Sequence, residues 1–296
     1  MSDIKKIKNR IKGVKDTKKI TNAMYLIAST KLSKAKSSLD AARPFFGAVS
    51  AEIKRIFRID SDIESKYFYP ADGSSMPDSI IGCLVITADK GLAGAYNINV
   101  IKETQKIMER HAVTKLFVVG EYGRNYFAQR NIPIERSFLY TAQNPTIQRA
   151  EEISALLLDM YEKGQIQKLY VVYTDFQSAR GERATSFRLL PFHRAQFVTP
   201  TVEKEVTKPF EFYPSMTDVL DQIVYSYVSG FIYGALVDSY CSEQNARMLA
   251  MDSANRNAEK ILDELTVEFN RVRQGAITNE IIEISSGAKA LRHNKE

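Results

Sequence analysis

The first sixty residues carry one apolar stripe at alternating three- and four-residue steps, and this repeat limits the possible folds more than any other feature. The stripe comprises Ile4, Ile7, Ile11, Val14, Lys18, Thr21, Tyr25, Ala28, Leu32, Ala35, Leu39, Ala42, Phe46, Val49, Ile53 and Ile56. Only Lys18 and Thr21 are clearly polar, and the period matches a coiled-coil seam. The stripe predicts one long helix over residues 1–59. Pro44 lies inside it, and because proline removes a backbone donor we expect a bend there rather than an end.

The C-terminal segment carries a second stripe with the same period. No proline follows Pro214, and Ser215 with Asp218 three residues later is the pattern of a capping box at a helix start. The stripe comprises Met216, Leu220, Ile223, Tyr227, Gly230, Gly234, Val237, Cys241, Gln244, Met248, Met251, Asn255, Ala258, Leu262, Leu265, Phe269, Val272 and Ala276. Gly230 and Gly234 each cost about 1 kcal/mol relative to alanine inside a helix, so we expect them to allow close backbone approach by a neighbour.

Two helices at opposite ends of one chain that both need an apolar partner can supply it to each other. With a rise of about 1.5 Å per residue, the predicted helices reach roughly 85 and 115 Å, which is too long for a compact globule. We therefore predict an antiparallel coiled coil between residues 1–59 and 211–296.

The segment between the two helices has the pattern of an α/β domain over residues 80–210. Short β-branched apolar runs predict buried strands at residues 80–88, 115–120 and 168–174. Amphipathic stretches between them predict helices at residues 98–110, 122–129 and 146–163. This alternation favours a mostly parallel, Rossmann-like sheet, with residues 184–191 as a further edge strand. Residues 60–79 are polar and contain proline and glycine, so we interpret them as a linker.

Positive charge is concentrated at the N-terminus. The net charge is +6, and residues 1–36 contain eleven lysine and arginine residues against Asp3 and Asp16. This basic face is either solvated or meets nucleic acid, an anionic membrane surface or an acidic protein loop. No apolar run reaches the roughly 18 residues of a membrane span, so we expect no direct membrane insertion. The N-terminus lacks the uninterrupted apolar core of a signal peptide.

The residues that could carry catalysis form no known constellation. Cys83 and Cys241 lie far apart, and the three histidines lack metal-ligand spacing. The loop at residues 89–97 follows a predicted strand and opens a helix, where backbone N–H groups can cradle phosphate. It lacks both the P-loop ending and the dinucleotide fingerprint. We interpret it as a turn that uses Gly91 and Gly94 for backbone freedom, and we predict no catalytic residue, metal or cofactor.

Motifs at both ends and in the centre of the chain resemble the gamma subunits of F-type ATP synthases. They lie at residues 7–24, 28–32, 87–97, 242–251 and 269–284. The resemblance covers nearly the whole chain and implies a non-catalytic central shaft without an active site of its own. In that family both helices rise through a hexamer of alpha and beta subunits, while the α/β domain lies against the epsilon subunit and the membrane c-ring. Proton or sodium flow turns the ring and the shaft, which changes the nucleotide affinities of the beta subunits.

The resemblance also implies contacts with the alpha and beta subunits and a location. The implied contact residues are Met24, Lys18, Lys19, Arg273, Gln274, Thr278 and Glu280. The first three match positions near an acidic loop of the catalytic subunits, and the other four match a patch near the C-terminus. By composition alone, these last four are simply a solvated helix face. The simplest interpretation is a bacterial protein that is peripheral to the cytoplasmic face of the plasma membrane.

Two other functions fit parts of the sequence. A basic coiled-coil protein could bind nucleic acid through its first helix, with an affinity that falls steeply with salt. A nucleotide-dependent α/β enzyme could use the central domain, although the expected phosphate-binding fingerprints are missing.

Overall fold

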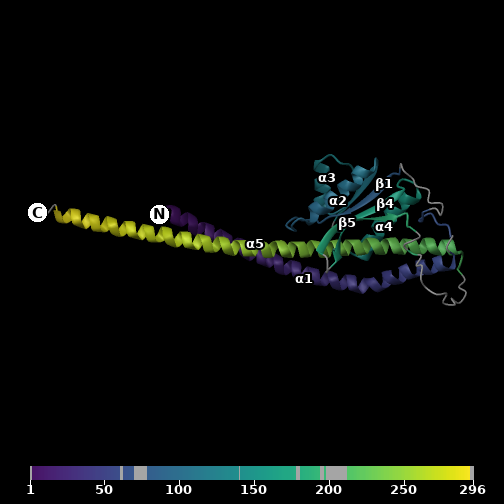
Figure 1. Cartoon of the computed structure of the whole chain (residues 1–296), viewed down its shortest axis with the longest axis horizontal. Helices are drawn as coiled ribbons and strands as arrows, with labels where there is room; N and C mark the ends of the chain where they lie inside the picture. The colour runs from purple at the N-terminus through teal and green to yellow at the C-terminus, as the bar shows by residue number, and fades with distance from the viewer. Residues whose placement is uncertain are drawn as a thin grey trace. The chain divides into compact units, whose positions relative to one another are not determined.

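The computed structural model describes residues 2–60, 63–69, 79–139, 141–177, 181–193, 197 and 212–293. Long helices begin and end the described chain: α1 spans Ser2–Ile59 and α5 spans Met216–His293 (Figure 1). As predicted, α1 continues through Pro44. Residue contacts divide the chain into two compact units, unit 1 with Met1–Ala28 and Met248–Glu296, and unit 2 with Ser29–Arg247. Most of the predicted linker at residues 60–79 lies outside the described residues, so the predicted domain borders stay predictions.

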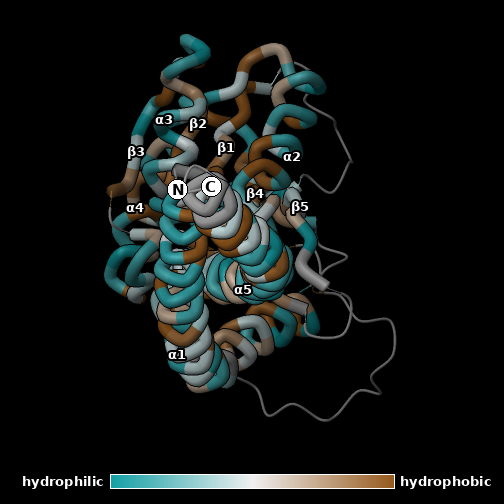
Figure 2. Tube along the Cα trace, turned by 90° about the vertical axis from the view of Figure 1, so that its left-hand side faces the viewer, coloured by the Kyte–Doolittle hydropathy of each residue, from teal (hydrophilic) through white to brown (hydrophobic). Residues whose placement is uncertain are grey.

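In unit 1 the two helices lie antiparallel. Lys18 pairs with Glu259 and Thr21 with Asn255, so the residue numbers of the two helices run in opposite directions. Stripe residues are the shielded ones: Ile7, Ala28, Met251, Ala258 and Leu265 are buried, and Ile11, Val14, Leu262 and Phe269 are half-buried. In residues 4–23 and 256–287 the residues off the stripe are exposed. Figure 2 accordingly shows α1 as mostly hydrophilic turns interrupted by hydrophobic bands.

The same two helices also pair in unit 2. Ala35 and Leu39 of α1 share a hydrophobic cluster with Val237 and Cys241 of α5, and half-buried Leu32 packs against it. The order is again antiparallel, which confirms the predicted arrangement of the terminal helices.

The two stripe glycines of α5 behave differently. A Cβ atom at Gly230 would overlap the ring of Phe46, so a neighbour does approach closely there, although it is a side chain rather than backbone. A Cβ atom at Gly234 would meet nothing within 4 Å. The expectation of close approach is therefore wrong at Gly234.

Among the described residues, five strands of unit 2 form one sheet in the order β3-β2-β1-β4-β5. The strands are β1 Ile81–Ile86, β2 Thr114–Val119, β3 Ile134–Phe138, β4 Lys168–Gln177 and β5 Gly181–Leu190. The strands β1 to β4 pair in parallel, and β5 is antiparallel to β4 at the edge. The predicted mostly parallel sheet is thus confirmed, as is the added edge strand. Our sequence analysis missed β3, an edge strand whose residues are only half-buried or exposed.

The side chains of β1 alternate between two hydrophobic layers, as expected for a strand that is covered on both faces. Ile81, Cys83 and Val85 point into a cluster with α2 (Tyr96–Arg110) and α3 (Glu121–Gln129). Leu84 and Ile86 point into a larger cluster with α4 (Ile147–Glu162). In Figure 1, α2 and α3 lie on one side of the sheet and α4 on the other.

The larger cluster also contains the end of α1 and the start of α5. Ile53, Ile56 and Phe57 of α1 are buried in it, as are residues of α5 between Leu220 and Leu236. These parts of the terminal helices therefore belong to the core of the α/β unit as well as to the helix pair. Within the described residues, no helix is long and apolar enough to cross a membrane.

Candidate functional surfaces

The polar members of the α1 stripe are paired across the helix interface of unit 1. The Nζ atom of Lys18 lies 2.6 Å from Oε1 of Glu259, and the hydroxyl group of Thr21 donates to Oδ1 of Asn255 at 2.5 Å. The hydrogen bond from Lys18 lowers the pKa of Glu259, which keeps this carboxylate ionised. Polar pairs at seam positions specify one register, because a shift would separate the partners.

The face of α1 beside this seam is both basic and apolar. Lys19 is exposed and lies 3.6 Å from Asp16, while Met24 is half-buried. Ile20 and Ile27 follow the helical spacing around Met24 and are 62% and 56% exposed. Our sequence analysis missed these two isoleucines, although their spacing from Met24 was visible. Exposed apolar side chains within a basic helix face are typical of a surface that another protein covers.

The C-terminal part of α5 is exposed on all sides. Arg273, Gln274, Thr278 and Glu280 are exposed, and the Thr278 hydroxyl donates to the Gln274 carbonyl at 2.9 Å. The same stretch exposes four isoleucines that our sequence analysis did not single out: Ile277, Ile281, Ile282 and Ile284. A helix that exposes several isoleucines next to charged groups presents an apolar surface for a partner.

In unit 2, the loop after β1 is fastened to α5 by Arg247. Its Nη2 atom donates to the Gly91 carbonyl at 3.1 Å, and its Nη1 atom lies 2.7 Å from Oε1 of Glu243. Burial raises the pKa of Glu243, and the positive charge of Arg247 opposes this shift. The buried ion pair thus connects the α/β sheet to the long C-terminal helix.

The same loop is a turn whose polar groups serve the fold. Oδ1 of Asp89 accepts a hydrogen bond from the Glu121 N–H group at 2.9 Å. Gly94 has φ +55°, as expected for a glycine needed for backbone freedom, but the other residue with positive φ is Leu92 at 61° rather than Gly91. The expectation for Gly91 was therefore wrong. These contacts hold the loop in place without a ligand.

The groups that could carry chemistry are dispersed. Within the described residues, no cluster of histidine, cysteine, aspartate and glutamate could hold a metal ion. Cys83 and Cys241 are buried thiols that are not joined in a disulfide. Burial raises the pKa of Cys83 to about 12, which makes it a poor nucleophile.

Comparisons with known proteins agree with these features. Residues 3–291 match the protein family described as ATP synthase. The ATP synthase gamma chain of Caldanaerobacter subterraneus subsp. tengcongensis is 40% identical over 287 residues, which cover 94% of this chain and 97% of that protein. The gamma chain of Acetivibrio thermocellus is 38% identical over 297 residues, which cover 99% and 100%.

A solved structure has the same fold. A chain in the central stalk and c-ring of the Tetrahymena thermophila mitochondrial ATP synthase superposes with a TM-score of 0.58 at 25% identity, over 79% of this chain and 99% of that chain. Paired terminal helices that carry an α/β domain thus define a central-stalk protein. Within this class, the chain belongs to the ATP synthase gamma chain family, as its motifs predicted.

Proposed function

We propose that the chain is the central rotor shaft of a bacterial F-type ATP synthase. It transmits the ion-driven rotation of a membrane c-ring to the catalytic beta subunits, which make or hydrolyse ATP. The observation that carries this proposal is the match over nearly full length to gamma chains, together with the antiparallel pairing of the two ends. Helices that pack along a continuous stripe resist twisting, and a shaft that transmits torque needs this stiffness.

The alpha and beta subunits surround unit 1 in this proposal. Two exposed features support the assignment: the basic and apolar face around Met24, and the isoleucines beside Arg273 and Gln274. The basic face suits an acidic loop of the catalytic subunits. Lys18 takes part in this contact while its Nζ atom is already held by Glu259, so Lys19 is the more available cation.

The α/β domain of unit 2 meets the epsilon subunit and the c-ring, and the complex is peripheral to the cytoplasmic face of the membrane. The Tetrahymena relative was solved as part of a central stalk with a c-ring, which supports this assignment. The chain itself carries no active site and binds no cofactor. In support, the loop at residues 89–97 uses its polar groups for its own turn.

Reconstitution of the chain with alpha and beta subunits tests the proposal. We expect ATPase activity that requires this chain, and a fall of about tenfold or more when Arg273 and Gln274 are both replaced by alanine, because paired interface contacts of this kind are worth at least 1–2 kcal/mol. The control replaces Asn270 and Arg271 by alanine, which are equally exposed on the same helix but lie outside the predicted patch. We expect it to retain activity within about twofold. Activity that does not depend on the chain would contradict the rotor proposal, and equal losses in both double variants would contradict the contact patch.

A further inference from the structure

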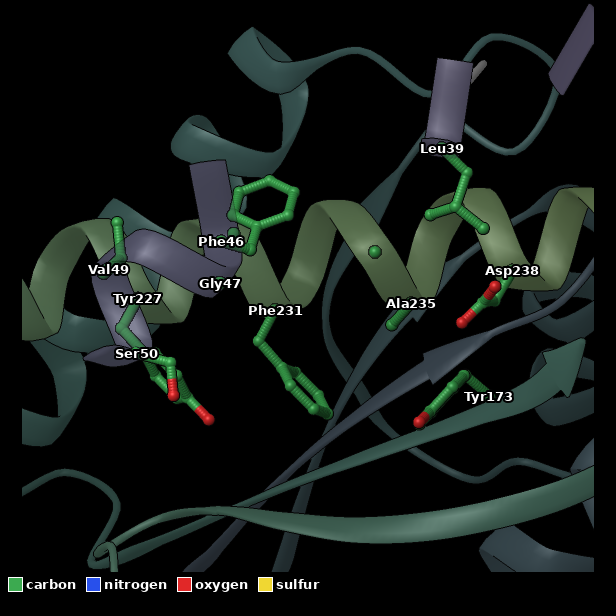
Figure 3. Close-up of a pocket in the computed structure, with 12 residues that line it drawn as sticks. Leu39, Phe46, Gly47, Val49, Ser50, Tyr173, Tyr227, Phe231, Ala235 and Asp238 are labelled. Carbon is green, nitrogen blue, oxygen red and sulfur yellow. The ribbon is translucent and has the colours of Figure 1, made fainter. Parts of the chain in front are cut away.

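A cavity of about 370 Å³ lies in unit 2 between α1, β4 and α5 (Figure 3). Pockets of this volume hold small organic ligands. Most of the side chains that line it are half-buried rather than fully buried, so the cavity reaches the surface.

The cavity arises from the two glycines that lie one helical turn apart on α5. At Gly230, the ring of Phe46 occupies the space that a side chain would need. At Gly234 no atom occupies the corresponding space within 4 Å. The absent side chain at Gly234 therefore leaves a gap in an otherwise packed helix interface. A helix interior position where alanine would be both better for the helix and sterically free is an unusual place for glycine.

The walls of the cavity are aromatic. Phe46, Tyr227 and Phe231 come from the two helices and Tyr173 from β4. Phe231 meets Tyr173 edge-on, with ring centroids 6.0 Å apart and an interplanar angle of 85°. Such walls offer both apolar area and ring faces, which carry partial negative charge.

The polar groups of the cavity are acceptors rather than cations. In Figure 3, Asp238 and Tyr173 lie at one end, and Ser50 and Tyr227 lie at the other. The lining includes no lysine, arginine or histidine among the residues that the structure describes. Burial raises the pKa of Tyr173 to about 12, and the negative charges of Asp175 and Asp238 add to this shift. The electrostatic potential in the cavity is therefore negative.

We propose that this cavity binds a small amphipathic amine, with an aromatic or alicyclic body and one ammonium group. The body fills the space over Gly234 and buries apolar area against the four rings. The ammonium group lies near the Asp238 end, where the carboxylate and the ring faces favour a cation and disfavour a carboxylate ligand. This assignment does not depend on the rotor role, because it rests on the lining of unit 2 alone.

Binding of tryptamine to the full chain tests the proposal. The chain contains no tryptophan, so the indole fluorescence of the ligand can be excited selectively and its anisotropy followed. Skatole serves as the neutral analogue and indolepropionate as the anionic one. We expect tryptamine to bind about tenfold more tightly than indolepropionate, with skatole between them. Equal or tighter binding of indolepropionate would overturn the assignment of a cationic ligand.

Three variants locate the site. Gly234→Leu fills the cavity and is expected to weaken tryptamine binding by about tenfold or more, whereas Gly234→Ala fills it partly and weakens binding less. Gly275→Leu is the matched control, because Gly275 is an exposed glycine of the same helix with nothing within 4 Å of a built Cβ atom. Asp238→Asn should retain skatole binding and abolish the preference for tryptamine. Unchanged tryptamine binding in both Gly234 variants would show that the cavity is not the site.

Discussion

At the scale of single residues, Arg247 makes the most consequential contact of unit 2. Its guanidinium group joins buried Glu243 on its own helix to the backbone of the loop after β1. The side chains of both residues are about 10% exposed, at 11% and 9%. A buried carboxylate that loses its cationic partner is strongly destabilising, whereas an exposed ion pair contributes little.

We predict that Arg247→Met lowers the free energy of unfolding by about 3 kcal/mol at neutral pH. Because the folded-state pKa of Glu243 is raised, its ionisation costs stability as pH rises above the unfolded-state pKa and through the folded-state pKa. Loss of the arginine raises that folded-state pKa further. The loss of stability should therefore be smaller at about pH 5 than at about pH 8.

Urea denaturation at the two pH values measures this effect. The control is Arg256→Met, which breaks the exposed pair of Arg256 with Asp252 at the same helical spacing. We expect the control to change stability by less than about 1 kcal/mol. A loss that is equal in the two variants, or that does not vary with pH, would show that burial of Glu243 does not govern this contact.

At the scale of elements, the stripe of α5 has two structural roles. Its second half faces α1 alone and is exposed on all other sides, while its first half also packs into the core of the α/β sheet. Gly230 and Gly234 lie in this first half, where one neighbour fills the notch of the first glycine and leaves that of the second open.

Alanine substitutions should therefore have opposite effects at the two glycines. Gly234→Ala removes the helix penalty of glycine without a clash, so we expect stability to rise by about 1 kcal/mol. Gly230→Ala displaces the Phe46 ring, which also packs on Tyr233 with centroids 5.9 Å apart. We expect a net loss of about 1–2 kcal/mol. Urea midpoints measure both effects, and equal stabilisation by both substitutions would contradict the tight contact at Gly230.

At the scale of the whole molecule, the two units bury very different amounts of apolar side chain. The two sheet-face clusters, which supply most of the buried core residues, belong to unit 2, whereas unit 1 has one apolar stripe on each helix. Segments with few buried contacts open more readily. The end of α5, with its exposed isoleucines, should be the least protected described helix segment in the free chain.

Hydrogen exchange tests this difference together with the proposed partners. In the free chain, we expect amides of residues 277–287 to exchange at least about a hundredfold faster than those of β1. Assembly with alpha and beta subunits should slow exchange in residues 277–287 by about tenfold or more and leave β1 unchanged. Exchange in this segment that is unaffected by assembly would contradict its insertion among the partner subunits.

The sequence by itself determined the elements whose pattern is local. A 3.5-residue period along the stripes of α1 and α5 was enough to predict both helices and their pairing, because a helix that exposes one apolar face needs a partner. The buried strands β1, β2 and β4 were equally readable as short β-branched runs. The motifs at both ends then indicated the family.

Only the tertiary structure decided how distant residues share space. The edge strand β3 was missed because a half-buried strand carries a weak pattern. The positive φ of Leu92 rather than Gly91, the pairing of Arg247 with the loop after β1, and the void over Gly234 depend on which side chains arrive from other elements. Such contacts join residues that are far apart in the chain, so neither period nor composition in one segment contains them.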